Sequence, residues 1–273
     1  MSLPQDSNKG VFHPFLRNKK LILFDLDGVI WRGQQVIPGA QQVLQTLSDN
    51  GKLIAYITNN STKTRDQYIA KLKSLGIHST AEQVYTSAYA TAEVLLRQDA
   101  KTAFVVGGDG IRDALNKVGI EISSLPSDEP VDAVVVGMDV NFTYATLRAA
   151  MRMILAGAEF IGTNPDTSFP AEDGISPGAG TMIAAISTGV GSLPKIVVGK
   201  PNPEMLQQAM NRFDIAPEDA VMIGDRLSTD IASGINAKIS TVRVLTGVQD
   251  HSKSIVPDLQ IASIKDLLIG KKR

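Results

Sequence analysis

Short apolar runs alternate along this chain with segments in which apolar residues recur every three or four positions. Runs rich in Ile, Leu, Val and Phe are typical of buried strands, and the recurring pattern is typical of amphipathic helices. We expect strands at Leu21–Phe24, Lys52–Thr58, Gln83–Thr86, Thr102–Val106, Ala133–Gly137, Glu159–Ile161, Lys195–Val198, Ala220–Ile223 and Thr241–Leu245. We expect helices at Ala40–Ser48, Arg65–Leu75, Tyr144–Ala156, Thr181–Ser187, Pro203–Phe213 and Thr229–Ile235.

This alternation of strand and helix predicts an α/β fold with a mostly parallel, doubly wound, Rossmann-like sheet. Short crossovers make the connections of such a sheet right-handed. Ligands bind at the carboxyl ends of its strands, so the residues that directly follow the apolar runs are the candidates for chemistry. The Gly- and Pro-rich stretch Ser168–Gly180 is expected to be a loop between domains or facing the site.

Two carboxylates, Asp25 and Asp27, follow the first apolar run with one residue between them, and Gly28 comes next. A carboxylate at the tip of a buried strand is costly unless a partner stabilises its charge. A hard cation such as Mg²⁺ suits two close carboxylates. The alternative is a turn or helix cap, where Asp is common, but similar strand ends downstream favour a site. Trp31 suits either the mouth of that site or the core.

Two further strand ends carry other polar groups. Thr58, Asn59 and Asn60 follow the second strand; their hydroxyl and amide groups suit an anion at a helix N-terminus, although they also fit an ordinary N-cap cluster. Lys200 follows a later strand and precedes two prolines that would fix the turn. That rigidity would aim its ammonium group at the sheet edge of Asp25, unless Lys200 is a solvated strand end.

A fourth strand end repeats the pattern of the first. Asp225 follows an apolar run and Gly224, and Asp230 comes five residues later. Asp230 suits a carboxylate that acts on a metal through water, or one stabilised by a helix dipole. At one sheet edge, the four strand ends would supply what phosphoryl transfer needs: metal-binding acids, hydrogen-bond donors and a cation. One carboxylate would attack phosphorus, and water would hydrolyse the acyl phosphate.

The strand-end residues resemble the four motifs of haloacid-dehalogenase-superfamily phosphatases. These motifs are Asp25-Leu26-Asp27-Gly28, Thr58-Asn59-Asn60-Ser61, Lys200, and Gly224-Asp225 with Asp230. Three further phrases are similar to the subfamily of NagD, the 4-nitrophenylphosphatases, phosphoglycolate phosphatase and pyridoxal phosphatase. They are Thr163-Asn164-Pro165-Asp166, Ser176-Pro177-Gly178-Ala179-Gly180 and Gly199-Lys200-Pro201-Asn202-Pro203. The resemblance extends over residues 20–268.

The resemblance implies a phosphoric monoester hydrolase that uses Mg²⁺. Asp25 would be the nucleophile and a metal ligand. Asp27 would be the general acid and base, with its backbone carbonyl on the metal. Asp225 would be the third protein contact to Mg²⁺, and Asp230 would act through water or through Lys200.

The remaining motif residues are implied to bind the phosphoryl group. Thr58 would hydrogen-bond to it, together with backbone N–H groups near Gly28 and Asn59. Asn60 would orient the loop of the nucleophile or the substrate. Lys200 would neutralise the charge of the nucleophile and of the phosphate.

In this subfamily a smaller α/β cap domain, of the C2 type, is inserted between the second and third motifs. The stretch between Asn60 and Lys200 is far longer than one crossover needs, which supports an insertion independently. The expected division is an N-terminal extension at 1–20, read as partly disordered, a catalytic core at 21–99 and 192–273, and a cap at 100–191. Asn164 and Asp166 are the candidates for the substrate-facing surface of the cap, although Asn-Pro-Asp equally suits a plain turn.

Composition narrows the function further. The chain has 273 residues, 43% of them hydrophobic, with a net charge of −1. This balance argues against binding of nucleic acid or of an anionic membrane. Cysteine is absent, which excludes disulfides and thiolate chemistry. We find no signal peptide and no membrane-spanning run, and we expect a cytoplasmic protein. The basic tail Lys271–Arg273 is expected to be solvated.

Two rival functions remain open. A phosphotransferase or phosphomutase could use the same motifs and pass the phosphoryl group to an organic acceptor. A non-catalytic protein that binds a phosphorylated metabolite is disfavoured by the intact acidic motifs. The partner is expected to be a small phosphorylated metabolite: a nucleotide, a sugar phosphate, phosphoglycolate or pyridoxal phosphate. A homodimer is also open, because dimers formed through the cap occur in the subfamily.

Overall fold

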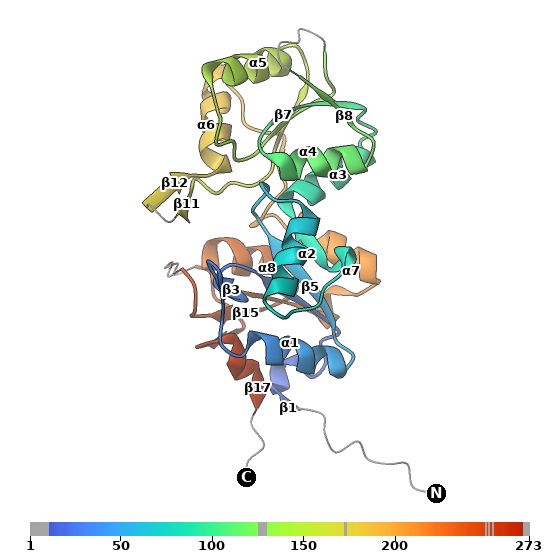
Figure 1. Ribbon diagram of the computed structural model, residues 1–273, viewed down its shortest axis with the longest axis vertical. Coiled ribbons are helices and arrows are strands. Elements are labelled where there is room, and N and C mark those ends of the chain that lie inside the picture. The colour runs from blue at the N-terminus through green and yellow to red at the C-terminus, as the bar shows by residue number, and fades with distance from the viewer. Residues whose placement is uncertain are drawn as a thin grey trace, which may run out of the picture. The chain divides into compact units, whose positions relative to one another are not determined.

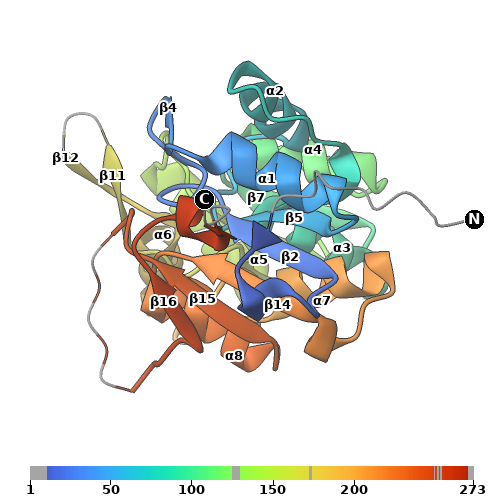
Figure 2. The same ribbon diagram turned by 90° about the horizontal axis from the view of Figure 1, so that it is seen from below.

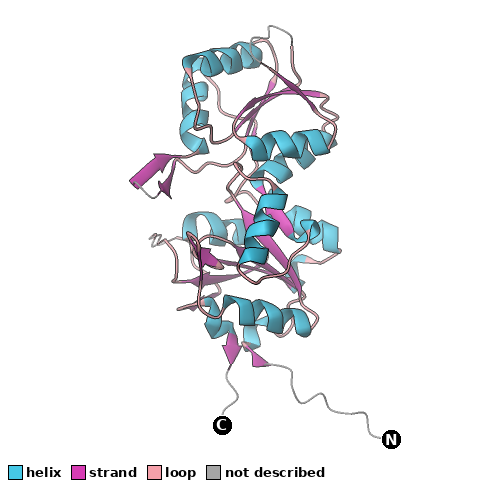
Figure 3. Cartoon of the chain, in the orientation of Figure 1, coloured by secondary structure: helices cyan, strands magenta, loops and turns pink. Residues whose placement is uncertain are grey.

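The computed structural model describes residues 11–124, 130–171, 174–248, 250, 252 and 254–269 (Figures 1 and 3). Its chain divides into two compact units. The first comprises Met1–Ile57, Lys71–Gln83 and Leu206–Arg273, and the second comprises Thr58–Ala70 and Val84–Met205. Each unit is built around its own parallel sheet, which confirms the predicted α/β class.

Five neighbouring strands of the first sheet run in the order β16-β15-β14-β2-β5, and every pairing among them is parallel. Their bounds are Leu259–Ile261, Ser240–Val244, Ala220–Gly224, Leu21–Asp25 and Leu53–Thr58. β2 is buried along its whole length, as a central strand with both faces covered requires. Figure 2 shows α1 (Ala40–Asp49) on one side of this sheet and α8 (Ala232–Asn236) on the other.

Shorter elements complete the first unit. β1 (Val11–Phe12) pairs antiparallel with β17 (Leu268–Ile269). β3 (Trp31–Arg32) and β4 (Gln35–Val36) form a hairpin directly after the first motif. α2 (Arg65–Ser74) and α7 (Glu204–Phe213) each extend across a boundary between the units.

The second unit contains a sheet in the order β13-β10-β9-β7-β8, again with parallel pairing throughout. Its strands span Ile196–Val197, Glu159–Gly162, Ala133–Val136, Thr102–Val106 and Glu121–Ser123. The helices of this unit are α3 (Ser87–Arg97), α4 (Asp109–Lys117), α5 (Tyr144–Leu155) and α6 (Ala179–Val190). β6 (Val84–Thr86) precedes α3, and β11 (Ser168–Ala171) pairs with β12 (Gly174–Pro177) in a hairpin.

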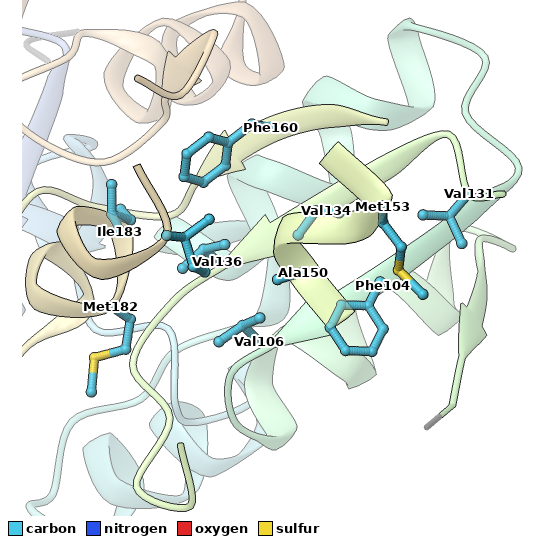
Figure 4. Close-up of a cluster of buried hydrophobic side chains, with 11 residues drawn as sticks. Phe104, Val106, Val131, Val134, Val136, Ala150, Met153, Phe160, Met182 and Ile183 are labelled. Atoms are coloured by element: carbon cyan, nitrogen blue, oxygen red, sulfur yellow. The ribbon is translucent and has the colours of Figure 1, made fainter. Parts of the chain in front are cut away.

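A hydrophobic core joins α5 and α6 to the sheet of the second unit (Figure 4). Strands β7, β9 and β10 contribute residues such as Val106, Val134 and Phe160, while α6 contributes Ile183 and Ile186. β9 is buried at all four positions. Both faces of this strand are therefore covered, which explains why it reads as a continuous apolar run.

Most of the expected elements are confirmed to within a few residues, but two expectations are wrong. Ser168–Gly180 was expected to be a loop, whereas it forms the hairpin β11–β12 and the first turn of α6. The strand before Lys200 was expected to share a sheet with Asp25, whereas β13 pairs with β10 in the second unit. A strand as short as β13, which has two residues, carries no information in its sequence about which parallel strand will be its neighbour.

The predicted domain boundaries remain a prediction. Residues 100–191, the expected cap, all fall in the second unit, which also takes in chain on either side of that range. Of the expected N-terminal extension, residues 1–10 lie outside the described residues, while 11–20 hold β1 and the buried Leu16. The basic tail Lys271–Arg273 also lies outside them.

Two isoleucines of the second unit differ in burial, so we expect their substitution to have different effects on the free energy of unfolding. Ile186 is fully buried in α6, whereas Ile175 in β12 is 83% exposed. Ile186→Ala is expected to lower the free energy of unfolding by about 2–5 kcal/mol, because it removes apolar contacts and leaves a cavity. The matched Ile175→Ala is expected to change it by less than about 0.5 kcal/mol. Urea denaturation measures both; equal losses would contradict this core assignment.

Candidate active site

Three aspartates of the first unit come together at the carboxyl end of its sheet. Asp25 ends β2, Asp225 follows the neighbouring strand β14, and Asp230 lies in the turn that comes next. One carboxylate oxygen of each lies within 4.8 Å of the others. The three residues are only 8, 3 and 1% exposed. Carboxylates this close together repel one another when they are ionised, so the cluster is suited to binding a cation.

The sequence after β14 explains how Asp230 reaches this cluster. Residues Leu227–Ile231 form one turn of π-helix, a feature that often occurs at functional sites. The Asp230 carboxylate accepts the backbone N–H groups of Asp225 at 3.1 Å and of Arg226 at 3.0 Å. Gly224 is required here, because a Cβ atom would collide with the Asp230 side chain. Asp230 therefore braces the loop that carries Asp225.

A second loop, which follows β15, holds Asp225 from the other side. The N–H group of Val248 donates to Asp225 Oδ2 at 2.6 Å. Gly247 packs so closely that a Cβ atom would overlap the same carboxylate. Gly28, with a φ of +88°, also faces Asp225, and a Cβ on it would lie 2.8 Å from Oδ2. The hydroxyl of Thr246 donates to the Gly28 carbonyl at 2.6 Å.

Arg243 and Asp250 tie this loop to the turn after Asp225. The Arg243 side chain, 7% exposed, donates to the Asp225 carbonyl at 3.1 Å and to the Asp250 carbonyl at 2.9 Å. Burial opposes ionisation of Asp250, but N–H groups of Leu227 and Ser228, the Ser228 hydroxyl and Arg243 outweigh it, so the pKa of Asp250 is lowered. The sequence reading missed both residues; the only signal was that they flank another strand end.

Asp27 lies outside the three-aspartate cluster. Its side chain is exposed, and its Oδ1 accepts the indole N–H of Trp31 at 2.8 Å. The sequence is compatible with Trp31 at the mouth of the site or in the core. In the structure the Trp31 ring is fully buried, and its N–H contacts the predicted general acid. The metal contact expected from the Asp27 carbonyl stays a prediction.

The second motif follows directly from β5. Ile57 is the register partner of Asp25, and Thr58 is the next residue. The Thr58 hydroxyl accepts the N–H of Asn60 at 3.2 Å. The Asn60 side chain accepts both the N–H and the hydroxyl of Thr62, at 2.9 and 2.7 Å. These bonds shape the loop after β5, but they do not cap a helix: α2 begins at Arg65, and Thr64 accepts the N–H of Gln67 at 3.2 Å. The phosphate contacts of this loop stay predictions.

Asn59 connects the second and third motifs within the second unit. Its Oδ1 accepts the N–H of Lys200 at 2.8 Å, and its Nδ2 donates to the Lys200 carbonyl at 2.9 Å and to Asp166 at 3.0 Å. The Asn59 carbonyl accepts Nδ2 of Asn164 at 2.8 Å. Lys200 is 2% exposed. The sequence predicted only that the backbone N–H near Asn59 binds phosphate. It did not predict that the Asn59 side chain bonds to Lys200 and Asp166.

Asn164 and Asp166 form part of this network. Asn164 is 4% exposed; its Nδ2 also contacts Thr163 Oγ1 at 3.2 Å, and its Oδ1 accepts the N–H of Asp166 at 3.2 Å. The Asn164 side chain thus shapes the backbone of the Asn-Pro-Asp phrase, and both interpretations of that phrase stay predictions. Substrate contacts of Asn164 and Asp166 stay predictions.

The donor set of the cluster fits a hard divalent metal. Asp25, Asp225 and Asp230 offer carboxylate oxygens, the ligands that Mg²⁺ and Ca²⁺ take in proteins. Nitrogen and sulfur ligands are absent from this group, which disfavours zinc or copper.

Comparison with known proteins identifies the family. A family model described as haloacid dehalogenase-like hydrolase matches residues 22–121, and a second HAD-hydrolase-like model matches 197–267. The acid sugar phosphatase of Staphylococcus haemolyticus is 39% identical over 258 residues, which cover 93% of this chain and 96% of that protein. The chain belongs to the haloacid dehalogenase-like hydrolases.

Solved structures agree with this assignment and with the NagD-like subfamily. The p-nitrophenyl phosphatase from Archaeoglobus fulgidus superposes with a TM-score of 0.85 at 32% identity, covering 91% of this chain and 97% of that one. NagD from Escherichia coli K-12 superposes with a TM-score of 0.83 at 31% identity, covering 91% and 98%. The protein is a phosphoric monoester hydrolase. Among the residues that the structure describes, no helix has the length and hydropathy of a membrane span.

The packing of Gly247 on Asp225 predicts a metal-binding phenotype. Gly247→Ala would push the Asp225 carboxylate away, because the new Cβ atom overlaps it. We expect the affinity for a divalent ion to fall by about 10- to 100-fold, as for other groups that support metal ligands. Calorimetric titration with Mg²⁺ measures this change directly.

Gly51→Ala is the control, because Gly51 also has a positive φ but has open space beyond its Cα atom. It is expected to lose some stability and to keep its metal affinity. Equal metal affinities of the Gly247→Ala variant and the wild type would contradict the close-packing argument.

Proposed function

We propose that the enzyme hydrolyses small phosphate monoesters with Mg²⁺ and passes through an aspartyl-phosphate on Asp25. The observation that carries this proposal is the cluster of Asp25, Asp225 and Asp230 at two neighbouring strand ends. Asp25 is buried at 8% exposure, and a desolvated carboxylate next to a cation is suited to nucleophilic attack on phosphorus.

In the proposed reaction, a carboxylate oxygen of Asp25 forms a bond to phosphorus while the bond to the leaving oxygen breaks. Asp27 gives its proton to that oxygen. In the second half, Asp27 takes a proton from water as the water oxygen attacks phosphorus, which releases inorganic phosphate and regenerates Asp25. Thr58, the N–H groups near Gly28 and Asn59, and Lys200 hold the phosphoryl oxygens.

Asp25 and Asp225, with the carbonyl of Asp27, would hold the metal, and Asp230 would support them. When bound, Mg²⁺ would neutralise charge on the phosphoryl oxygens. We favour Mg²⁺ over Ca²⁺ because Mg²⁺ keeps several waters and needs few protein carboxylates, whereas Ca²⁺ takes six to eight oxygen ligands and the cluster offers three carboxylates. A related glycerol phosphate phosphatase was solved with calcium, so the two ions have to be compared directly.

Sugar phosphates are the first substrates to test, because curated relatives are named acid sugar phosphatases. Nucleotides, phosphoglycolate and pyridoxal phosphate remain candidates. We assign substrate selection to the inserted segment 100–191, with Asn164 and Asp166 as candidate contacts. The network that ties both residues to Asn59 would link that segment to the phosphate-binding turn.

Substitution of the nucleophile tests the mechanism. Asp25→Asn is expected to lower the rate of phosphate release by more than about a thousandfold, because the amide cannot form the acyl phosphate. The wild type, quenched in acid during turnover, is expected to show the added mass of one phosphoryl group on the peptide that contains Asp25. Asp66→Asn is the control, because the Asp66 side chain is 72% exposed. A fully active Asp25→Asn variant would overturn the proposal.

Metal removal tests the cofactor. The enzyme treated with EDTA and dialysed is expected to release no phosphate from substrates, and Mg²⁺ is expected to restore the rate. Ca²⁺ is expected to bind and to support much slower turnover, because its longer bonds displace the carboxylates. Undiminished hydrolysis after chelation would rule out a metal-dependent mechanism.

A further inference from the structure

The residue predicted to be the general acid is held by the chain's one tryptophan. Within residues 21–31, Asp27 is the only exposed residue, and Trp31 is fully buried. The indole N–H of Trp31 donates to Oδ1 of Asp27 at 2.8 Å. The hydrogen bond therefore joins a fixed side chain of the core to the carboxylate that faces solvent.

The backbone and Lys71 hold the indole ring in place. Gly28 N–H donates to the Trp31 carbonyl at 2.7 Å, which closes the turn between Asp27 and β3. The ammonium of Lys71 lies 4.0 Å from the centroid of the Trp31 ring and donates to the Gly33 carbonyl at 3.0 Å. A cation over its face restrains the ring, so its N–H points at Asp27 from a constant direction.

The hydrogen bond from the indole N–H makes the two carboxyl oxygens of Asp27 different from each other. An indole N–H can only donate, so the carboxyl oxygen that it contacts must act as an acceptor whether Asp27 is protonated or not. The carbonyl oxygen of a protonated carboxyl group is the better acceptor, so this bond favours Oδ1 as the carbonyl oxygen and leaves Oδ2 to carry the proton. A carboxyl group without this partner can carry its proton on either oxygen and in several rotamers.

We propose that Trp31 is a positioning residue: its hydrogen bond to Oδ1 fixes the orientation of the Asp27 carboxyl group and aims Oδ2 at the leaving oxygen of the substrate. This inference rests on the proposed function, in which Asp27 is the general acid. As the bond from phosphorus to the leaving oxygen breaks, the proton moves from Oδ2 to that oxygen, and Oδ2 later accepts a proton from water.

A buried indole N–H needs a hydrogen-bond partner in any core, so a purely structural role for this bond has to be separated from a positioning role. Substrates with different leaving groups distinguish the structural role from the positioning role. An alkoxide leaving group needs a proton as it departs, whereas 4-nitrophenolate is a stable anion that departs without one. Loss of positioning therefore slows alkyl phosphates selectively, and loss of structure slows both substrates.

The experiment compares kcat/KM for 4-nitrophenyl phosphate and for an alkyl phosphate that the wild type hydrolyses, such as a sugar or glycerol phosphate. This parameter reports the first phosphoryl transfer, in which Asp27 acts as the acid. Trp31→Phe is expected to lower it about tenfold for the alkyl ester, and less than about twofold for the aryl ester. Circular dichroism checks that the variant is folded.

Three further variants keep the test decisive. Val43→Ala removes packing from the buried Val43 of α1 and is expected to leave the ratio of the two substrates unchanged. Lys71→Met keeps the indole but frees its face, and is expected to give a smaller loss with the same selectivity; it replaces Trp31→Phe if that variant does not fold. In an Asp27→Asn background, Trp31→Phe is expected to add no further loss, because it acts through Asp27.

The outcomes distinguish this inference from the function on which it rests. One outcome is that Asp27→Asn lowers kcat/KM mainly for the alkyl ester, while Trp31→Phe and Lys71→Met lower it equally for both substrates. This result would overturn the role of Trp31 and leave the proposed acid intact. An Asp27→Asn variant without selective loss would overturn both. Additive losses in the double variant would show that Trp31 acts independently of Asp27 and would also overturn the inference.

Discussion

Mutual repulsion among three buried carboxylates is the constraint on which the rest of the site depends. Asp25, Asp225 and Asp230 bring their oxygens within 4.8 Å of one another where they are almost fully shielded from water. Removing such groups from water is costly unless opposite charge compensates them. The strand order places β2 next to β14, so the fold itself brings Asp25 and Asp225 together, and a bound cation would offset the cost.

The chain accommodates this cluster by closing two loops around Asp225. Gly28 and Gly247 remove side-chain bulk on the approach to its carboxylate, and Val248 donates a backbone N–H to it. Asp230 uses its own carboxylate to tie down the backbone N–H groups of the same loop. These backbone contacts fix the orientation of Asp225 and would preorganise it for the proposed metal.

The sequence predicted the parts of this structure that depend on local pattern. Apolar runs located β2 and β14, and the polar residues at their ends pointed to Asp25 and Asp225, because parallel strands present their carboxyl ends together. It did not reveal that β13 joins the second sheet, since pairing between distant strands has no local signature. It also missed Arg243 and Asp250, and it did not predict the hydrogen bond from the Trp31 indole to Asp27, because these contacts depend on how loops fold back onto the strand ends.

The most direct measurement of the central claim is the position of the metal. Crystals grown with Mn²⁺ in place of Mg²⁺ give anomalous scattering that locates the ion without reference to the protein. The account predicts a peak within about 2.5 Å of carboxylate oxygens of both Asp25 and Asp225. A fully occupied peak elsewhere, with these two aspartates uncoordinated, would contradict it.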